Sequence, residues 1–323
     1  MPSAVRTDRL TKDFTTGFWR PRPHRGLDGL TCDIPLGGVF GLLGPNGAGK
    51  STTLKLLLHL LRPSSGTAEV LGHPPGDVRA HQRVGFLPEN PTFYDYLTAE
   101  ELLTYFAGLF GYSKADCAAR AAKTLDRVGL AGDRRRPLRQ YSKGMVQRVG
   151  IAQALINDPE LVIFDEPMSG LDPLGRRDVR ALILRLRDRG CTVFFSSHVL
   201  SDAEALCSRV AILAKGRLIA SGQLSDMVAF HARGWELVVA GMSDAAAAAI
   251  APRVRRITKI GDGRYELTLP LDPAPDRIMT ELVAAGAHVV SLNPIRETLE
   301  DFFVQQVTSP DTLAVRRGLE DAR

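Results

Sequence analysis

The chain contains 323 residues, of which 44% are hydrophobic and 24% are charged, so its composition is that of a globular protein able to bury a sizeable core. A chain of this length is expected to form about two domains. Its formal net charge of +5 is modest and more typical of a solvated, arginine-rich surface than of a dedicated nucleic-acid or membrane-binding patch, so no specific nucleic-acid partner is predicted.

The four cysteines, Cys32, Cys117, Cys191 and Cys207, are scattered and form no C-x-x-C pair. This spacing argues against a disulfide framework and against a zinc site, and it fits a reducing cytosol. Residues 1–8 contain no apolar signal region, and no run of the sequence approaches the roughly 18 apolar residues that a membrane-spanning helix needs. We therefore expect a chain that does not cross a bilayer and that reaches a membrane only through another chain.

Residues 4–43 are predicted to be rich in β-structure, interrupted at 15–26 by a segment of Gly, Pro and Arg that favours an exposed loop. Phe14, Phe18 and Trp19 lie at or near this loop. Their rings could stack on a nucleobase, although surface exposure or packing in the core would explain these aromatic residues equally well.

Residues 44–51 fit the pattern G-x-x-x-x-G-K-[ST] of a nucleotide-binding P-loop. An apolar run at 39–43 predicts a buried strand before this loop, and leucines with helical spacing over 54–61 predict an amphipathic helix after it. The glycines let the backbone wrap closely around a phosphate, and the helix N-terminus favours an anion. Lys50 would then reach the β- and γ-phosphates, and Ser51 would hold Mg²⁺. The residues of this loop that are predicted to bind the nucleotide are Gly44, Pro45, Asn46, Gly47, Ala48, Gly49, Lys50, Ser51 and Thr52.

Residues 91–160 change character and are predicted to be mainly helical. Thr98 and Glu101 have the spacing of a capping box, which marks the start of a helix. Ser142 is a natural N-cap for another helix near the end of this segment.

Alternating β and α segments return after the helical segment. Residues 161–164 form a continuous apolar run, typical of a central parallel strand covered on both faces, and Asp165 and Glu166 follow it directly. Residues 192–195 predict a second buried strand, and His198 lies just beyond it. Because ligands gather at the carboxyl ends of the strands in parallel α/β sheets, these three side chains are expected to converge.

The chemistry of the three residues suits nucleotide hydrolysis. Asp165 could ligate Mg²⁺ directly or through water, Glu166 could orient or deprotonate an attacking water, and His198 could sense the γ-phosphate. Each signal is weak by itself, because acidic pairs are common and a lone histidine at a strand end is more often structural. Their combination with a P-loop indicates a single site.

The composition shifts after the last predicted β/α unit, and residues 235–292 predict the order strand, helix, strand, strand, helix, strand. This βαββαβ order is compatible with a small ferredoxin-like module. One further helix is predicted at 298–307, and the polar segment 309–323 is predicted to be a loose tail. The predicted domains are therefore residues 4–222 and 225–308.

One more motif, residues 141–145, lies between the P-loop and Asp165. With it, the order of the motifs resembles that of the nucleotide-binding subunit of ABC transporters. The matching segments are the P-loop (44–52), the Gln-loop region (87–90), the signature (141–145), the carboxylate strand (161–167), the D-loop (169–172) and the switch histidine, His198. Six motifs in a fixed order leave little room for chance, and the resemblance covers residues 4–222.

The resemblance implies the P-loop ABC ATPase fold. This α/β fold has a mainly parallel core sheet, an N-terminal antiparallel β-subdomain and a helical signature subdomain, here at 91–160, and it would be joined to a small C-terminal α+β module at 225–308. In the family, two such domains meet head to tail and sandwich two ATP molecules, so the signature of one protomer contacts the γ-phosphate bound by the other. The residues outside the P-loop that the resemblance assigns to nucleotide binding are Phe14, Ser142, Lys143, Gly144, Met145 and Asp172.

The same resemblance implies an ATP-hydrolysing subunit that drives a separate integral membrane permease, which the helical segment would contact. The chain would be a peripheral protein at the cytoplasmic side of the cell membrane, with ATP and Mg²⁺ as its ligands. A homodimer is the expected assembly, and the sequence leaves a heterodimer open as well. Phe14 matches the aromatic residue that stacks on adenine in the family, and Lys50, Glu166 and His198 match its catalytic residues.

Two positions depart from the family pattern. The signature is Tyr-Ser-Lys-Gly-Met where the family usually has Leu-Ser-Gly-Gly-Gln, but Ser142 and Gly144 are kept, so the phosphate contact should be kept too. Glu89 replaces the usual glutamine of the Gln-loop; its carboxylate can still ligate Mg²⁺, but it adds negative charge near Glu166. We expect altered coupling rather than lost activity. Together with residues 291–303, these departures resemble the drug, antibiotic and ABC-2-type export subunits of bacteria.

Two other classes of protein are the alternatives. A soluble ABC protein that acts on ribosomes or DNA usually carries two ATPase halves or a long coiled coil, whereas this chain has one P-loop and no sustained heptads. A non-hydrolysing nucleotide sensor would not need Glu166 and His198, although the changes at Glu89 and Lys143 leave that alternative open. The sequence therefore predicts the ATPase subunit of an exporter, without indicating its cargo.

Overall fold

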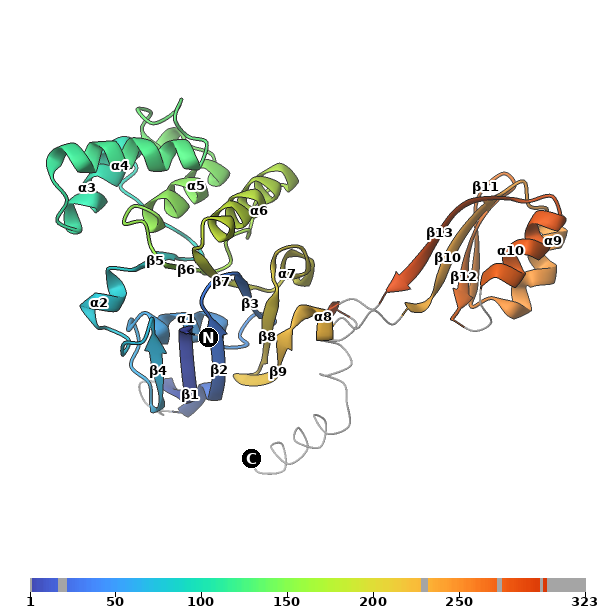
Figure 1. Cartoon of the computed structure of the whole chain (residues 1–323), viewed down its shortest axis with the longest axis horizontal. Coiled ribbons are helices and arrows are strands. Elements are labelled where there is room, and N and C mark those ends of the chain that lie inside the picture. Colours follow the sequence, from blue (N-terminus) through green and yellow to red (C-terminus); the bar gives the residue numbers. More distant parts are fainter. Residues whose placement is uncertain (1, 17–21, 228–231, 272–274, 297–298, 301–323) are drawn as a thin grey trace. The chain divides into compact units, whose positions relative to one another are not determined.

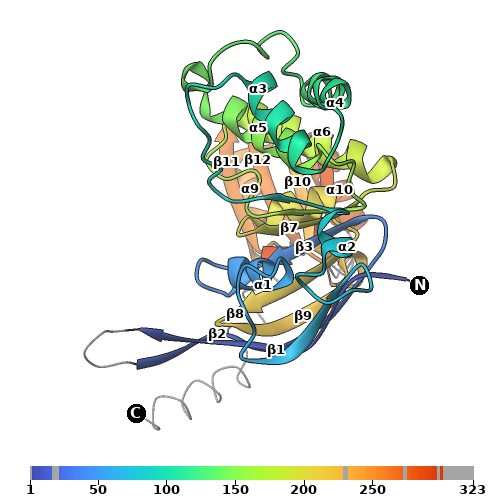
Figure 2. The same ribbon diagram turned by 90° about the vertical axis from the view of Figure 1, so that its left-hand side faces the viewer.

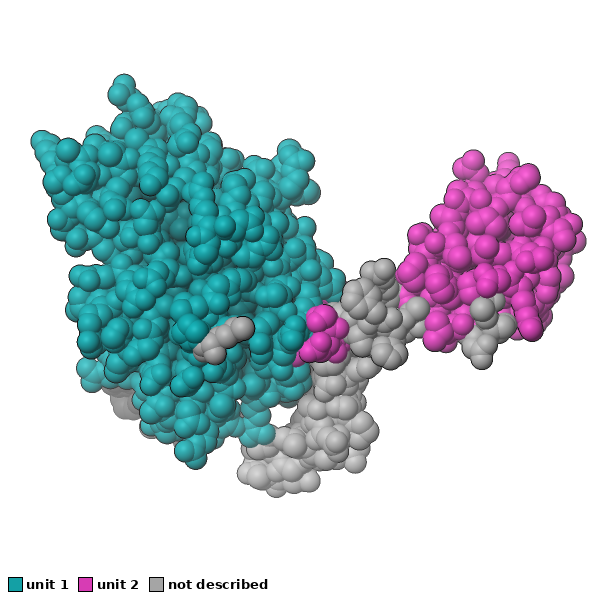
Figure 3. Space-filling model, in the orientation of Figure 1, with its two compact units in different colours: residues 1–224 teal, residues 225–323 magenta. Residues whose placement is uncertain are grey.

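The computed structural model describes residues 2–16, 22–227, 232–271, 275–296 and 299–300. The chain divides into two compact units, Met1–Leu224 and Ser225–Arg323 (Figure 3). Each unit contains its own hydrophobic core. Phe18 and Trp19, most of the helix predicted at 298–307 and the tail at 309–323 lie outside the described residues.

A six-stranded sheet forms the centre of the first unit, in the order β5-β6-β7-β3-β8-β9 (Figure 1). Its strands are β3 (Val39–Leu43), β5 (Val84–Leu87), β6 (Leu161–Phe164), β7 (Thr192–Ser197), β8 (Arg209–Ala214) and β9 (Arg217–Gln223). Neighbouring strands are parallel except β8 and β9. Every residue of β3, β6 and β7 is buried, as expected of strands covered on both faces. The carboxyl ends of these three adjacent strands therefore bring the P-loop, Asp165 and His198 to one edge of the sheet.

Helices α1 (Lys50–Leu57), α2 (Val78–His81), α6 (Pro173–Asp188) and α7 (Leu200–Leu206) connect these strands. Helix α6 begins as the sequence predicts, because Asp172 accepts a hydrogen bond from the backbone N–H of Gly175 and Pro173 occupies the first helical position. Its buried residues recur with helical spacing and are Val179, Leu182, Ile183 and Leu186.

A second, antiparallel sheet has the order β2-β1-β4, with β1 (Ser3–Thr16), β2 (Arg22–Pro35) and β4 (Ser65–Val70). The loop predicted at 15–26 is wrong over most of its length, because Thr15 pairs with Pro23 and Phe14 with His24, so both strands continue. Proline is tolerated there because β2 is an edge strand and needs no second set of ladder hydrogen bonds. Figure 2 shows this hairpin projecting beyond the rest of its sheet.

The segment between β5 and β6 is mainly helical, as predicted, with α3 (Ala99–Leu109), α4 (Lys114–Arg127), the short η1 (Leu138–Gln140) and α5 (Lys143–Ala154). The predicted capping box is present at α3. The Thr98 side chain accepts a hydrogen bond from the N–H of Glu101, and the Glu101 carboxylate accepts one from the N–H of Thr98. Together these helices form the upper part of the first unit in Figure 1.

The second unit contains β10 (Ala232–Ala240), α9 (Asp244–Ile250), η2 (Ala251–Arg253), β11 (Arg256–Gly261), β12 (Arg264–Pro270), α10 (Pro275–Ala284) and β13 (His288–Arg296), after the short α8 (Leu224–Met227). This is the predicted βαββαβ order. Its antiparallel sheet, β11-β12-β10-β13, has the strand arrangement of ferredoxin-like modules. Alternate residues of β12 are buried, and they pack with α9 and α10 residues such as Ile250 and Ile278 in one core.

Candidate nucleotide-binding site

The loop between β3 and α1 requires glycine at two positions. Gly44 has φ 151°, and a Cβ built on it would lie 2.2 Å from the carbonyl oxygen of Leu213. Gly49 has φ 103°, and its Cβ would lie 2.7 Å from the carbonyl oxygen of Gly26. The loop is thus held tightly between β8 and β2, and it ends at the N-terminus of α1, where first-turn N–H groups favour an anion.

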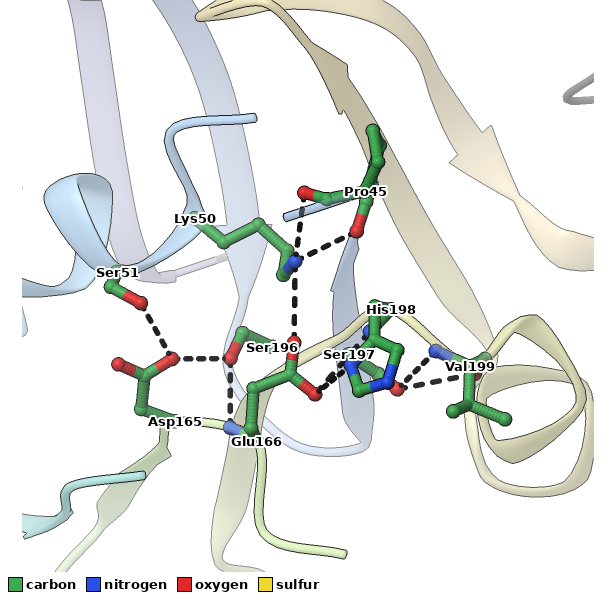
Figure 4. Close-up of polar contacts among 10 residues, drawn as sticks. Pro45, Lys50, Ser51, Asp165, Glu166, Ser196, Ser197, His198 and Val199 are labelled. Carbon is green, nitrogen blue, oxygen red and sulfur yellow. Dashed lines mark hydrogen bonds and ion pairs between the residues drawn. The ribbon is translucent and has the colours of Figure 1, made fainter. Parts of the chain in front are cut away.

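The side chain of Lys50 is buried and folds back over this loop. Its Nζ donates to the carbonyl oxygens of Gly44 and Pro45, at 2.7 and 3.2 Å, and lies 3.2 Å from Oε1 of Glu166 (Figure 4). Lys50 and Glu166 are both buried, and each charge balances the other. Burying either charge without its partner would be strongly destabilising. Two carbonyl oxygens of the P-loop and the Glu166 carboxylate therefore hold the ammonium group beside the loop.

Asp165 is 4% exposed and faces two hydroxyl groups. Its Oδ1 accepts hydrogen bonds from Oγ of Ser51, at 3.2 Å, and from Oγ of Ser196, at 2.6 Å (Figure 4). Ser51 and Asp165, from the P-loop helix and the end of β6, thus meet as predicted. A hydroxyl and a carboxylate are oxygen donors of the kind that Mg²⁺ prefers, so this pair fits that ion.

Glu166 is held on both sides of its carboxylate. Oε1 faces Lys50, while Oε2 lies 2.8 Å from Nδ1 of His198. The residue has φ +48°, a left-handed conformation that costs a non-glycine residue about 1–3 kcal/mol and is typical of functional sites. The structure therefore brings together three of the residues that the sequence predicts, Lys50, Glu166 and His198, in one connected cluster.

Lys50, Ser51 and Glu166 border a cleft of about 380 Å³. Its lining consists of residues 46–52 of the P-loop with Phe14, His24, Gly26, Glu89 and Glu166. Phe14 therefore lies beside the P-loop. Its ring packs over Gly26, where a Cβ would come within 2.5 Å of the ring. Glu89 is exposed at the same cleft, and within the described residues no group of three or more His, Cys, Asp and Glu side chains could by itself hold a metal.

Side chains at the start of α5 contact residues 167–170 of the same chain. Ser142 caps α5 by accepting a hydrogen bond from the N–H of Met145, and Nε2 of Gln147 donates to the carbonyl oxygen of Pro167. The side chain of Lys143 lies against Gly170, where a Cβ would come within 2.1 Å of Nζ. Ser142 and Lys143 are not among the residues that border the cleft.

A P-loop, a Mg²⁺-compatible Ser–Asp pair and a glutamate bracketed by lysine and histidine define a nucleotide hydrolase of the P-loop class. The ABC transporter family model matches residues 27–169. An uncharacterized ABC transporter ATP-binding protein of Synechocystis sp. is 44% identical over 94% of this chain and 85% of its own length. The chain belongs to the ABC transporter family, as an ATP-binding subunit with ATPase activity.

Two further similarities bear on assembly and role. The fluoroquinolones export ATP-binding protein of Mycobacterium tuberculosis is 36% identical, over 86% of each chain. An ATP-binding cassette solved as a dimer in a post-hydrolysis state, bound to ADP and Pi, superposes with a TM-score of 0.62 at 25% identity, over 68% of this chain and 98% of that one. In the described part of the chain, no helix is both long and apolar enough to span a membrane.

Proposed function

We propose that the chain is the Mg²⁺-dependent ATPase subunit of an export system, working as a head-to-tail homodimer on a separate membrane permease. The observation that carries the ATPase role is the position of Glu166, between Lys50 and His198 at the edge of the P-loop cleft. The export role is supported by the similarity to the fluoroquinolones export protein. The chain would then be peripheral, at the cytoplasmic side of the cell membrane.

The contacts of Lys50 suggest how the site is activated. In the structure, its ammonium group pairs with Glu166. Phosphate oxygens of bound ATP would take over this ammonium group, since a multiply charged phosphate is the stronger partner. Oε1 of Glu166 then becomes free to accept a proton from an attacking water, while His198 still holds Oε2. Mg²⁺, held by Ser51 and Asp165, would supply positive charge to the phosphates.

The second half of each ATP site would come from the partner protomer. Ser142 lies at the N-terminus of the 12-residue helix α5, which is a favourable place for a phosphate. Lys143 adds a positive charge at the same helix end. Tyr141 stands where leucine is usual in the family, and its hydroxyl donates to the carbonyl oxygen of Asp133, which fixes the start of the signature. Burial raises the pKa of Tyr141, so this hydroxyl stays protonated.

We place the permease contact on the helical segment. A groove of about 490 Å³ lies between β5 and the helices, and its lining includes four phenylalanines, Phe86, Phe93, Phe106 and Phe110. Tyr94, Tyr105 and Leu109 are exposed nearby on the same segment. An apolar groove of this kind suits a short helix from a membrane subunit.

Copurification from mildly solubilised membranes tests this assignment. A tagged chain should recover a stoichiometric polytopic membrane protein, and Phe110→Asp should lose it because the charge enters the apolar groove. Leu60→Asp, at an exposed leucine outside the groove, is the matched control and should retain the partner. Recovery with ribosomal proteins or nucleic acid would favour the soluble ABC protein instead. A partnered complex that binds ATP but never releases phosphate would favour the nucleotide sensor.

Because Phe14 lines the cleft beside the P-loop, we expect its removal to weaken binding of the adenine base and not of the phosphates. Phe14→Ala should weaken ATP binding by about 1–3 kcal/mol, the range for stacking of one base on an aromatic ring. Binding of inorganic triphosphate should not change, because the P-loop is untouched. Fluorescence titration of both ligands measures the difference, and Tyr94→Ala, an exposed aromatic residue outside the cleft, serves as the control. Equal losses for both ligands would contradict the stacking role.

We assign residues 4–222 as the nucleotide-binding domain and 225–308 as a module that regulates or supports the dimer. The separate hydrophobic core of this module, which includes Leu237, Leu267 and Ile278, supports its assignment as a distinct domain. Plain stabilising packing is the simpler alternative for it.

A further inference from the structure

Ser196 is a buried residue beside Asp165 and Glu166 to which the proposed mechanism assigns no role. It lies at the carboxyl end of β7 and is 0% exposed. Its Oγ donates to Oδ1 of Asp165 at 2.6 Å and accepts a hydrogen bond from the backbone N–H of Glu166 at 2.9 Å (Figure 4). One hydroxyl therefore contacts two consecutive residues, one expected to hold the metal and one expected to activate water.

The contact with Glu166 supports an unfavourable backbone. The N–H of Asp165 still bonds to the carbonyl of Leu87 in the neighbouring strand, but the chain turns away at Glu166, whose φ is +48°. The hydroxyl of Ser196 takes the place of the lost strand partner for this buried N–H, which would otherwise be unsatisfied. Removing the hydroxyl removes the group that holds the turn in its left-handed conformation.

The contact with Asp165 keeps that carboxylate oriented. An O–H···O⁻ bond of 2.6 Å is in the range of strong, charge-assisted hydrogen bonds. Ser51 donates to the same oxygen at a longer distance, and Ser51 is also expected to bind the metal. Among the described residues, the hydroxyl of Ser196 contacts only the Asp165 carboxylate and the N–H of Glu166. The two bonds form a chain from the N–H of Glu166 through Oγ to Asp165, in which each bond polarises the other.

We propose that Ser196 is a positioning residue: its hydroxyl orients the carboxylate of Asp165 and holds the backbone turn that places the carboxylate of Glu166. Metal binding and water activation would then both depend on one buried hydroxyl. This inference rests on the proposed Mg²⁺-dependent ATPase function. Its neighbour Ser197 provides a natural comparison. Ser197 is also buried, but its hydroxyl bonds to the N–H and carbonyl of Val199, just before α7, and contacts neither carboxylate.

The experiment compares Ser196→Ala, Ser196→Thr and Ser197→Ala in the full-length chain. For each protein, ATP affinity is measured by fluorescence titration in EDTA and in excess MgCl₂, and phosphate release is followed against MgCl₂ concentration. In Ser196→Ala, the gain in ATP affinity on adding Mg²⁺ should shrink, and the half-activating Mg²⁺ concentration should rise by roughly 10- to 100-fold, as for other partners of metal ligands. Affinity in EDTA should stay within about twofold of the wild type, since the P-loop is unchanged.

The controls separate positioning from general damage. Ser196→Thr keeps the hydroxyl and should recover most of the Mg²⁺ response, whereas Ser197→Ala should leave that response at the wild-type level. A wild-type Mg²⁺ response in Ser196→Ala, or an equal loss in Ser197→Ala, would overturn the inference while leaving the ATPase function standing. A wild-type protein without any Mg²⁺-dependent affinity or turnover would instead overturn the proposed function.

Discussion

Replacing Glu166 by glutamine is expected to lower ATP turnover by roughly two to four orders of magnitude while ATP still binds, since a positioned general base contributes about that much. Glutamine keeps the size of the side chain and can still accept a hydrogen bond from Lys50, so the P-loop should keep its shape. It cannot accept the proton of the attacking water. Phosphate release gives the rate, and equilibrium titration gives the affinity.

The same variant tests the proposed dimer. If ATP contacts both protomers, a protein that binds ATP and cannot hydrolyse it should accumulate as a closed dimer, which size-exclusion chromatography with light scattering will detect. Glu160→Gln is the matched control, because Glu160 is half-exposed at the amino end of β6, the opposite end from Glu166, and pairs only with Arg83 among the ion pairs of the described residues. A Glu166→Gln protein that hydrolyses ATP at the normal rate would remove Glu166 from its assigned role.

The main features of this site could be predicted because each depends on a short stretch of sequence. The P-loop is one contiguous pattern, and the apolar run before Asp165 marks a buried strand by itself. That His198 would meet Glu166 required only the general rule that ligands bind at the carboxyl ends of parallel strands. The strand order β6-β7-β3 then provides the contact, although that order could not be derived from the sequence.

The features that could not be predicted depend on pairing between distant segments. The role of Ser196 follows from the register of β6 against β7, which places Phe164 opposite Phe195. His24 reaches the cleft because it pairs with Phe14 across a ladder, where the Gly, Pro and Arg content had favoured a loop. The contact of Lys143 with Gly170 depends on the path of a long side chain, which no periodic pattern encodes. In each case the residue itself is visible in the sequence, but the distant residue that it contacts cannot be read from the sequence.

Lys50→Ala is expected to have the largest effect on nucleotide binding. The side chain of Lys50 is 6% exposed, and its ammonium group is held in place by two carbonyl oxygens and Glu166. Truncating one partner of a buried, hydrogen-bonded charge pair costs about 2–5 kcal/mol, which corresponds to roughly a 30- to 5000-fold weaker Kd. Lys55→Ala, on the same helix but exposed, should bind ATP normally.

A second variant separates the loss of the phosphate contact from the loss of the ion pair between Lys50 and Glu166. Removing Lys50 alone leaves Glu166 with His198 but without its cation, and this unbalanced charge both destabilises the protein and repels phosphate. Lys50→Ala combined with Glu166→Gln removes that charge. If Lys50 acts directly on the phosphates, the double variant should regain thermal stability and still bind ATP weakly. If its affinity returns to the wild-type value, the lysine serves only to balance Glu166, and the phosphate contact must be assigned to the backbone of the P-loop.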